Sequence, residues 1–355
     1  MSSRFLRGDL RGLNAYVPGE QPKDGSGVIK LNTNENPFPP PEKAVKAAES
    51  ALSRVRLYPD PNLTDLKAAL ERYYRLPPGT VSLTNGSDEG LAFIFIGFCE
   101  AGAAFADVTY GFYRVLADLF RVPYTAVPLR ADFSPDIADY AAVKGTVILA
   151  NPNAPTGMGL PIGAIETLLN QNPDRLVVVD EAYAAFGGES CLRLIGRYDN
   201  LCVVSTFSKN RSMAGARLGL VAANPALMAD FERIRCSFNP YNVNAATLKL
   251  GEYSVYEDEY YRDNIKKTIE NRAFLVAGLD KLGFTTLPSQ ANFILTRPPG
   301  GQGKAYYERL KKDNILVRYF ETERLKSHVR VSVGTRADMA ALLDKTAGYL
   351  REGLV

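Results

Sequence analysis

The residues best suited to chemistry gather around one lysine, Lys209. Hydroxyl side chains flank it at Thr206, Ser208 and Ser212, and Arg217 follows eight positions after the lysine. A lysine amine condenses with an aldehyde to a Schiff base, and burial or cationic neighbours make such amines reactive. Hydroxyls and a guanidinium bind phosphate. This stretch suits pyridoxal phosphate, an aldehyde cofactor with a phosphate group. The alternative is a solvated loop lysine near a structural arginine.

Several further candidates share one position, the C-terminal end of an apolar strand. These candidates are Ser87 after 81–84, Tyr110 after 103–108, Thr156 after 146–150, Asp180 after 176–179 and Lys209 after 201–204. The strands alternate with helices from about residue 80 to 205, which predicts an α/β protein with a parallel sheet and helices on both faces. Ligands bind at the carboxyl edge of such sheets, so these side chains should meet there.

Each of these residues also has an ordinary structural explanation. Ser87 and Asp88 follow a glycine turn at Gly86, where helical N–H groups form an anion cradle or a serine simply caps the helix. Tyr110 can stack on a planar ring or be a half-buried core tyrosine. A carboxylate such as Asp180 at the end of an apolar strand is costly unless it is paired. A metal ion is the rival partner, but no Asp, Glu or His arrangement in the sequence joins Asp180.

Composition limits the class of protein. The 355 residues are 46% hydrophobic, which is enough for two domains with large cores. The 42 basic and 39 acidic residues give a formal charge of +3, and no basic run stands out, so a nucleic-acid partner is not expected. The single histidine, His328, argues against a metal site and a Ser-His-Asp triad. Dispersed cysteines, no apolar leader and no run long enough for a bilayer favour a cytoplasmic protein away from membranes.

The chain divides into three predicted regions. Residues 1–30 form an N-terminal arm, residues 31–250 a large domain, and residues 251–355 a small α+β domain. The polar loop at 31–41 (LNTNENPFPPP) carries more asparagine than turn geometry requires, which favours a functional role.

Two arginines lie inside apolar strands of the small domain. Strands are predicted in this domain at 291–295, 315–319 and 329–333. Earlier in the chain, the sequence predicts a helix after Pro135 and a helical stretch at about 245–282. Arg318 and Arg330 fall within the last two of these strands. Buried arginines need an anion, so they either pair with structural carboxylates or bind an anionic substrate.

Ten segments, in this order and spacing, resemble the histidinol-phosphate aminotransferases, which are fold-type I pyridoxal-phosphate enzymes. They are LNAYVPG (13–19), LNTNENP (31–37), YPD (58–60), GSDE (86–89), TYG (109–111), DEAY (180–183), TFSK (206–209), AGARLG (214–219), ANF (291–293) and VRVSVGT (329–335). The match covers nearly the whole chain. It implies a large domain with a mostly parallel seven-stranded sheet flanked by helices, and a smaller α+β C-terminal domain.

The resemblance implies a role for each candidate residue. Lys209 resembles the Schiff-base lysine, Asp180 the partner of the pyridine nitrogen, and Tyr183 a donor to the ring O3′. Tyr110 is similar to the aromatic residue that stacks on the ring. The implied phosphate cradle consists of Gly86, Ser87, Asp88, Thr206, Ser208 and Arg217, with Tyr58 reaching it from a neighbouring subunit of a homodimer. Arg330 resembles the ligand of the substrate α-carboxylate, and the distal part of the substrate would lie among Tyr16, Asn36 and Arg318.

One position departs from the family pattern. Members usually carry an asparagine directly before Pro-Thr-Gly, where it donates a hydrogen bond to the ring O3′. This chain has Ala154 at that position, preceded by Asn153. Either one donor is missing, or water or Asn153 replaces it. A missing donor would destabilise the O3′ anion, so the Schiff base should hold its proton more tightly.

The resemblance implies transfer of the amino group of histidinol phosphate to 2-oxoglutarate, which gives imidazole acetol phosphate and glutamate. This is a ping-pong reaction of histidine biosynthesis, in which Lys209 moves the proton from Cα to C4′. Two other enzymes fit the same motifs: a threonine-phosphate decarboxylase of the cobalamin pathway and an aromatic amino-acid aminotransferase. A non-catalytic ligand sensor on this fold would need an appended DNA-binding domain, and the presence of both Lys209 and Asp180 favours the enzyme.

Overall fold

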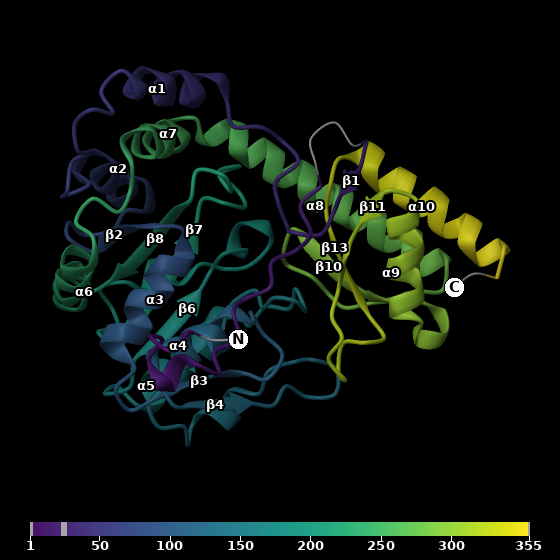
Figure 1. Cartoon of the computed structure of the whole chain (residues 1–355), viewed down its shortest axis with the longest axis horizontal. Helices are drawn as coiled ribbons and strands as arrows, with labels where there is room; N and C mark the ends of the chain where they lie inside the picture. Colours follow the sequence, from purple (N-terminus) through teal and green to yellow (C-terminus); the bar gives the residue numbers. More distant parts are fainter. Residues whose placement is uncertain (1–2, 23–26, 354–355) are drawn as a thin grey trace.

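Short runs of β-branched and other apolar residues form the central sheet (Figure 1). The computed structural model describes residues 3–22 and 27–353. The strands of this sheet are β2 (Val81–Asn85), β3 (Ala103–Ala106), β4 (Tyr124–Val127), β5 (Thr146–Ala150), β6 (Val177–Asp180), β7 (Leu201–Thr206) and β8 (Leu218–Ala223). Their order is β2-β8-β7-β6-β5-β3-β4, and β8 alone runs opposite to the other six strands. The predicted mostly parallel seven-stranded sheet is confirmed.

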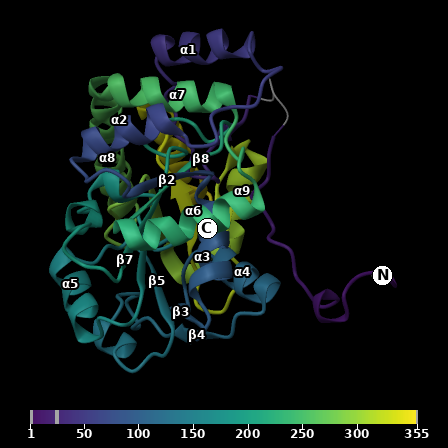
Figure 2. The same ribbon diagram turned by 90° about the vertical axis from the view of Figure 1, so that its left-hand side faces the viewer.

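Helices cover both faces of this sheet, because successive residues of a strand point to opposite sides. Val177 and Val179 pack in the core beneath α2 and α5, whereas Val178 packs in the core beneath α3, α4 and α6. Figure 2 shows α5 on one side of the strands and α3 and α4 on the other. The helices of this part are α1 (Glu42–Leu52), α2 (Thr64–Tyr74), α3 (Ser87–Phe98), α4 (Phe112–Phe120), α5 (Ile162–Gln171), α6 (Pro225–Phe238) and α7 (Ala245–Tyr256).

The C-terminal part has a separate, smaller core. Its antiparallel sheet has the order β12-β13-β10-β9, and β1 pairs in parallel with β11. The elements are β1 (Ile29–Lys30), β9 (Thr285–Thr286), β10 (Phe293–Arg297), β11 (Ile315–Leu316), β12 (Arg318–Tyr319), β13 (Val329–Ser332), α8 (Asp258–Lys281), α9 (Gly303–Lys312) and α10 (Arg336–Arg351). Leu31, the first residue of the predicted large domain, packs in this core. The division at residues 31 and 250 stays a prediction.

The predicted helical stretch at 245–282 is two helices rather than one. α7 ends at Tyr256, and Glu257 leaves the helical conformation with φ −91° and ψ 36°. At this break the Asp258 carboxylate accepts hydrogen bonds from Arg211 and Tyr73. These contacts tie the start of α8 to α2 and to the loop after β7. From there α8 runs across to the C-terminal core (Figure 1).

Other elements differ from the sequence prediction. The helix expected after Pro135 is only a 3-10 turn, Ile137–Tyr140. The strand expected at 315–319 splits into β11 and β12, which belong to different sheets. β8 and α6 follow the lysine loop and were not predicted. The remaining 3-10 turns are Gly8–Leu10, Ala184–Phe186, Cys191–Leu194 and Pro299–Gly301.

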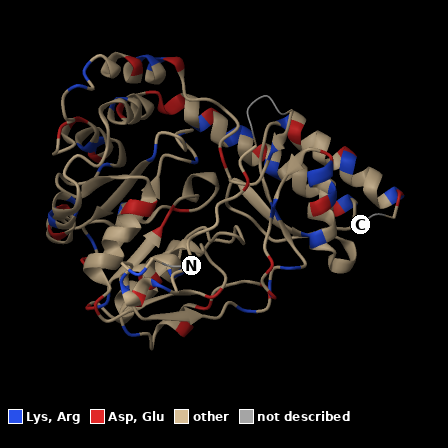
Figure 3. Ribbon diagram, viewed as in Figure 1, with Lys and Arg blue, Asp and Glu red and all other residues tan. Residues whose placement is uncertain are grey.

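Two surface features accompany this fold. Basic and acidic side chains are mixed along the long helix α8 and the C-terminal helices (Figure 3). Within residues 3–22 and 27–353, no helix is both long and apolar enough to cross a membrane.

Candidate active site

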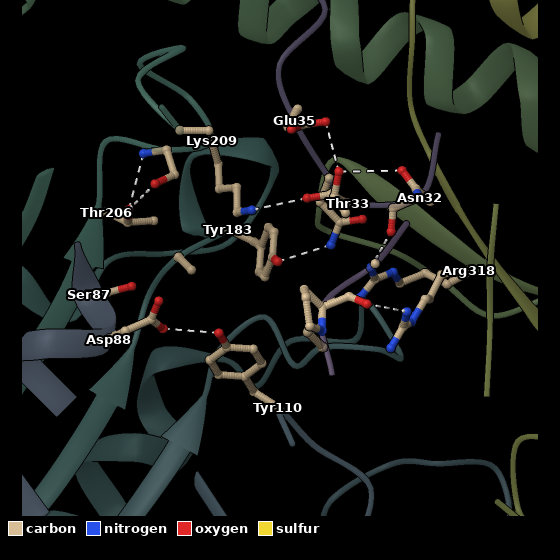
Figure 4. Close-up of a pocket in the computed structure, with 18 of the residues that line it drawn as sticks. Asn32, Thr33, Glu35, Ser87, Asp88, Tyr110, Tyr183, Thr206, Lys209 and Arg318 are labelled. Carbon is tan, nitrogen blue, oxygen red and sulfur yellow. Dashed lines mark hydrogen bonds between the residues drawn. The ribbon is translucent and has the colours of Figure 1, made fainter. Parts of the chain in front are cut away.

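A cavity of about 440 Å³ opens at the carboxyl edge of the large sheet, facing the C-terminal part. Its size is typical of sites for small ligands. The predicted site residues that line it are Tyr16, Ser87, Asp88, Tyr110, Asp180, Tyr183, Thr206, Ser208, Lys209, Arg217, Arg318 and Arg330. Figure 4 shows Lys209 and the start of α3 on one side of this space and Arg318 on the other. The fold therefore gathers residues that lie up to 314 positions apart in the sequence (330 − 16).

Lys209 lies in the loop that follows β7. Its Nζ donates a hydrogen bond to the backbone oxygen of Thr33 at 3.3 Å and stands 5.7 Å from the centre of the Tyr183 ring. The backbone oxygen of Lys209 accepts a hydrogen bond from Asn36 Nδ2 at 2.9 Å. Among the described residues that line the cavity, Lys209 is the only lysine. The loop therefore holds one amine in the cavity and fixes its backbone from the facing polar segment.

Asp180 closes β6, and its carboxylate is buried at the base of the cavity. Tyr113 donates to Oδ2 at 2.7 Å, and the backbone N–H of Ala182 donates to Oδ1 at 3.1 Å. Burial raises the pKa of Asp180 to about 6, and these two hydrogen bonds oppose that rise. A buried carboxylate with two neutral donors gains most from a cationic partner, such as a protonated ring nitrogen.

An anion cradle forms where α3 begins. Gly86 precedes the helix with φ 78°, and no side chain caps the first N–H groups of the helix. A Cβ at Gly86 would collide with the guanidinium of Arg217, so glycine keeps this approach open. Arg217 Nη2 lies 3.0 Å from Asp88 Oδ2, and the hydroxyl of Thr206 donates to that of Ser208 at 2.9 Å. Helical N–H groups, two hydroxyls and a guanidinium together suit a phosphate.

Aromatic side chains form the walls between these groups. Tyr110 donates its hydroxyl to Asp88 Oδ1 at 3.0 Å, and its ring meets that of Tyr16 edge-on at 6.1 Å. The Tyr183 hydroxyl accepts a hydrogen bond from Asn34 Nδ2 at 3.0 Å (Figure 4). Tyr110 and Tyr183 thus present a flat face and a hydroxyl near Lys209, as a planar cofactor ring requires.

Two arginines form the opposite wall. Arg330 Nη2 donates to the backbone oxygen of Asn32 at 2.9 Å, while its Nε is buried without a partner. Among the described residues, Arg318 donates only to the backbone oxygens of Val17 and Pro18, at 3.2 and 3.4 Å. Burial lowers the pKa of the Arg330 guanidinium. Across residues 3–22 and 27–353, neither arginine forms an ion pair with a carboxylate, which favours an anionic substrate over a structural partner.

Known proteins are similar to this chain over nearly its whole length. The sequence model of the family "Aminotransferase class I and II" matches residues 26–345. The chain belongs to the class I and II aminotransferase family. A relative named histidinol-phosphate aminotransferase 2, from Dechloromonas aromatica, is 44% identical over 96% of this chain and 98% of its own length. The histidinol-phosphate aminotransferase of Clostridium botulinum is 40% identical over 97% and 98%.

A solved structure agrees with these relatives. The histidinol-phosphate aminotransferase of Sinorhizobium meliloti, in complex with pyridoxal-5′-phosphate, superposes with a TM-score of 0.84 at 25% identity and covers 92% of this chain and 91% of its own. Family membership confirms the predicted fold, the predicted class of reaction, amino-group transfer, and the predicted cofactor, pyridoxal phosphate. The cavity of this aminotransferase fits that cofactor, because its buried carboxylate, its lysine and its anion cradle match the ring nitrogen, the aldehyde and the phosphate.

Besides Gly86, which directly precedes the cavity residues Ser87 and Asp88, three predicted site residues of the aminotransferase are not among those that line this cavity. Asn153 donates one amide hydrogen to the backbone oxygen of Val108 and the other to Thr156 Oγ1, both at 3.0 Å. Asn36 bonds to the lysine loop and not to the substrate end of the site. Tyr58 is 80% exposed and stacks on Tyr241 at 4.4 Å. Within one chain, none of the three is among the residues that line the cavity.

Ala154 borders the cavity, where it packs against Ala291, Phe293 and Tyr183. Because Asn153 has already donated both amide hydrogens, it has none left for a ring oxygen. The sequence analysis named water and Asn153 as replacements for the missing donor, and the geometry does not support Asn153. The lost donor itself stays a prediction.

The sequence analysis missed several residues of this aminotransferase site. Asn34 and the backbone of Thr33 bond to Tyr183 and Lys209, and the Phe320 ring lies 5.5–5.6 Å from the guanidinium carbons of Arg318 and Arg330. The asparagine-rich loop at 31–41 was the available signal for the first two. Tyr113 gave no signal, since its partner Asp180 lies 67 positions away.

Proposed function

We propose that this aminotransferase transfers the amino group of histidinol phosphate to 2-oxoglutarate. The observation that carries the proposal is the wall of Arg318 and Arg330, which face the cavity with no carboxylate partner among the described residues. An amino substrate with a phosphate supplies the anion that these guanidiniums need. Relatives that are 40–44% identical carry the name of this activity, which supports the same substrate.

Each site residue would have its own role in the reaction, set by its position in the cavity. When bound, pyridoxal phosphate supplies an electron sink for the bonding pair released at the substrate Cα. Lys209 would hold the cofactor and, once displaced by the substrate amine, would take the proton from Cα through its Nζ. Asp180 would stay ionised against the ring nitrogen, and Tyr183 would donate to the ring oxygen. Arg217, Ser87, Ser208 and their neighbours in the cradle would anchor the phosphate of the cofactor.

The arginine wall must serve two different anions in turn. Histidinol phosphate carries a phosphate where an amino acid carries its carboxylate, whereas 2-oxoglutarate carries two carboxylates. Arg330, deeper in the cavity, suits the anionic group next to Cα, whereas Arg318 can share the phosphate of histidinol phosphate and suits the second carboxylate of 2-oxoglutarate. A guanidinium binds a phosphate or a carboxylate with the same pair of parallel N–H donors. One site can therefore bind each substrate after the other has left, as ping-pong kinetics require.

A half-reaction screen tests the proposed substrate. The cofactor-loaded enzyme is mixed in separate samples with histidinol phosphate, threonine phosphate and phenylalanine, without any oxo acid. The expected result is rapid conversion of the aldehyde form of the cofactor to its amine form with histidinol phosphate. Release of carbon dioxide from threonine phosphate, with no conversion by histidinol phosphate, would instead establish the decarboxylase. Conversion by phenylalanine alone would establish an aromatic aminotransferase.

We also infer that two copies of the chain associate through the face around Tyr58. Leu52, Val55, Leu57 and Tyr58 are 48–80% exposed on the end of α1 and the segment that follows it. An apolar cluster of this kind marks an interaction surface. Tyr58 lies outside the cavity of its own chain, so only a second copy could bring it to a cofactor phosphate.

Sedimentation velocity tests this association. The wild-type protein should sediment as a dimer, and Val55→Asp should give monomers that bind pyridoxal phosphate more weakly. Val55→Thr, which introduces no charge, is the matched control and should remain a dimer. A monomeric wild type would contradict the inference. The cytoplasmic location expected from the dispersed cysteines stays a prediction.

A further inference from the structure

Tyr113 is a fully buried tyrosine on α4 that touches two groups of the site without lining the cavity. Its hydroxyl donates to Asp180 Oδ2 at 2.7 Å. Its ring meets the Tyr110 ring edge-on, with 5.6 Å between the centroids, and packs against Phe105 at 5.7 Å. One rigid side chain therefore supports both the carboxylate beneath the cavity and the aromatic wall beside it.

The position of Tyr113 is fixed from several sides. It belongs to the apolar core between the sheet and the helices α3, α4 and α6. A hydroxyl in such surroundings has no water to exchange with, so its hydrogen bond to Asp180 is not replaced when it is lost. Burial and the neighbouring Asp180 charge raise the pKa of Tyr113 well above its usual range, so the hydroxyl keeps its proton and remains a donor.

We propose that Tyr113 is a positioning residue that holds Asp180 ionised and oriented for the ring nitrogen of the cofactor. The carboxylate has two donors, and the other is a backbone N–H, at Ala182, that no side-chain substitution removes. Donors to the charged form of a carboxylate favour that form. Tyr113 thus offsets part of the cost of burying the charge that the cofactor needs. This role is independent of the amino substrate, so it stands or falls separately from the proposed histidinol-phosphate activity.

The charged groups around Asp180 either raise or lower its pKa. Asp88 at the start of α3 raises the pKa of Asp180, whereas Lys209 in the loop after β7 lowers it. Glu181, the next residue, is itself buried and its pKa is raised to about 7, chiefly by burial. After burial and Asp180, the groups that raise the pKa of Tyr113 are Tyr110 and Tyr183. Loss of the Tyr113 hydroxyl therefore leaves Lys209 and the Ala182 N–H as the groups that favour the ionised carboxylate.

The test is the pH dependence of cofactor affinity in Tyr113→Phe, which removes the hydroxyl and keeps the ring against Tyr110. Cofactor-free protein is titrated with pyridoxal phosphate between pH 5.5 and pH 9, and protein fluorescence reports binding. Binding needs ionised Asp180, so affinity falls below the pKa of this group. The variant should show this fall about one pH unit higher than the wild type. At pH 6 its affinity should be about fivefold weaker than that of the wild type, and at pH 9 the two should agree.

Tyr140→Phe is the matched control. Tyr140 is equally buried, and its hydroxyl makes no hydrogen bond with the described residues. It lies in the core on the other face of the sheet, so its pH profile should coincide with that of the wild type. In an Asp180→Asn background, Tyr113→Phe should no longer shift the profile.

A second measurement needs no cofactor. Relative to the wild type, Tyr113→Phe should lose more stability at pH 8 than at pH 5, because only the ionised carboxylate depends on the lost donor. Equal affinity profiles for the wild type and Tyr113→Phe, or the same shift in Tyr140→Phe, would overturn the proposal. So would a shift that persists in the Asp180→Asn background.

Discussion

Replacing Asp180 by asparagine should stabilise the cofactor-free protein at neutral pH while it removes the partner of the ring nitrogen. The carboxylate is 5% exposed and ends a strand whose other residues are apolar. Asparagine has nearly the same shape and no charge. Its Oδ1 can still accept from the Ala182 N–H, and the Tyr113 hydroxyl can rotate to accept from the new amide. The substitution therefore removes the charge with little change in packing.

The size of the effect follows from the titration of the carboxyl group. Burial raises the pKa of Asp180 from 3.8 to about 6 in the folded protein. Each pKa unit corresponds to about 1.4 kcal/mol, so keeping Asp180 ionised costs the folded state about 3 kcal/mol above pH 7. The folded protein holds this proton more tightly than the unfolded chain. The cost is therefore absent below about pH 4, grows as the pH rises through about 6, and is constant above that value.

Denaturant unfolding of the cofactor-free protein at pH 5 and pH 8 measures this difference. Asp180→Asn should exceed the wild type by about 3 kcal/mol at pH 8 and by clearly less at pH 5. Asp280→Asn, at an exposed position of α8, is the control and should leave both values unchanged. Asp180→Asn should also lose turnover, because an uncharged side chain no longer favours a protonated ring nitrogen.

A variant that is no more stable than the wild type at pH 8 would refute this reasoning. So would a stability gain that is the same at pH 5 and pH 8, since a gain of that kind would come from packing and not from charge. In either case Asp180 would already be compensated within the protein. Its burial would then carry no information about a cationic ligand.

Four further outcomes are expected. Lys209→Ala should lose the visible absorbance of the lysine-bound cofactor together with turnover, and residual wild-type turnover would contradict its role. Arg318→Ala should raise KM for phosphorylated substrates by about tenfold or more and for unphosphorylated aromatic ones less, as steady-state kinetics would show; equal losses mean that it does not bind the phosphate. Ala154→Asn should lower the pH midpoint of the cofactor absorbance change, and an unchanged midpoint would mean that no donor is missing. Arg211→Ala should cost about 3 kcal/mol in urea unfolding because Asp258 loses its buried partner, and a loss below about 1 kcal/mol would contradict this.

Sequence reasoning succeeded where a local pattern determines position. Apolar runs followed by a polar residue located Asp180 and Lys209 at strand ends, and the parallel topology then brought them into one cavity. This inference needs no knowledge of the contacts between side chains. The two arginines were found in the same way, as charges inside apolar strands.

Contacts between distant segments were beyond local patterns. Tyr113 is an ordinary aromatic of an amphipathic helix until the fold places Asp180 against it. Asn153 and Asn36 carry the right functional groups, yet their hydrogen bonds go to Val108, Thr156 and the lysine loop. Whether an amide side chain faces a cavity or a backbone group depends on the local backbone conformation, which residue spacing alone does not give. The break before α8 was missed, and the contact of Asp258 with Arg211 that accompanies it spans 47 positions.

The site contains buried charged groups that no ion pair within the described residues neutralises. Asp180 is a buried anion held by two neutral donors, and Arg330 has a buried Nε that no described residue engages. Two other buried arginines are matched by ion pairs, Arg235 with Glu232 and Arg211 with Asp258, whereas Arg175 and Glu181 are held by neutral groups away from the cavity. Burying an unmatched charge costs stability, and Asp180 and Arg330 differ from Arg175 and Glu181 because they line a cavity in which a ligand can offset that cost. A cationic ring nitrogen and an anionic substrate offset that cost at opposite ends of one cavity, with Lys209 between them.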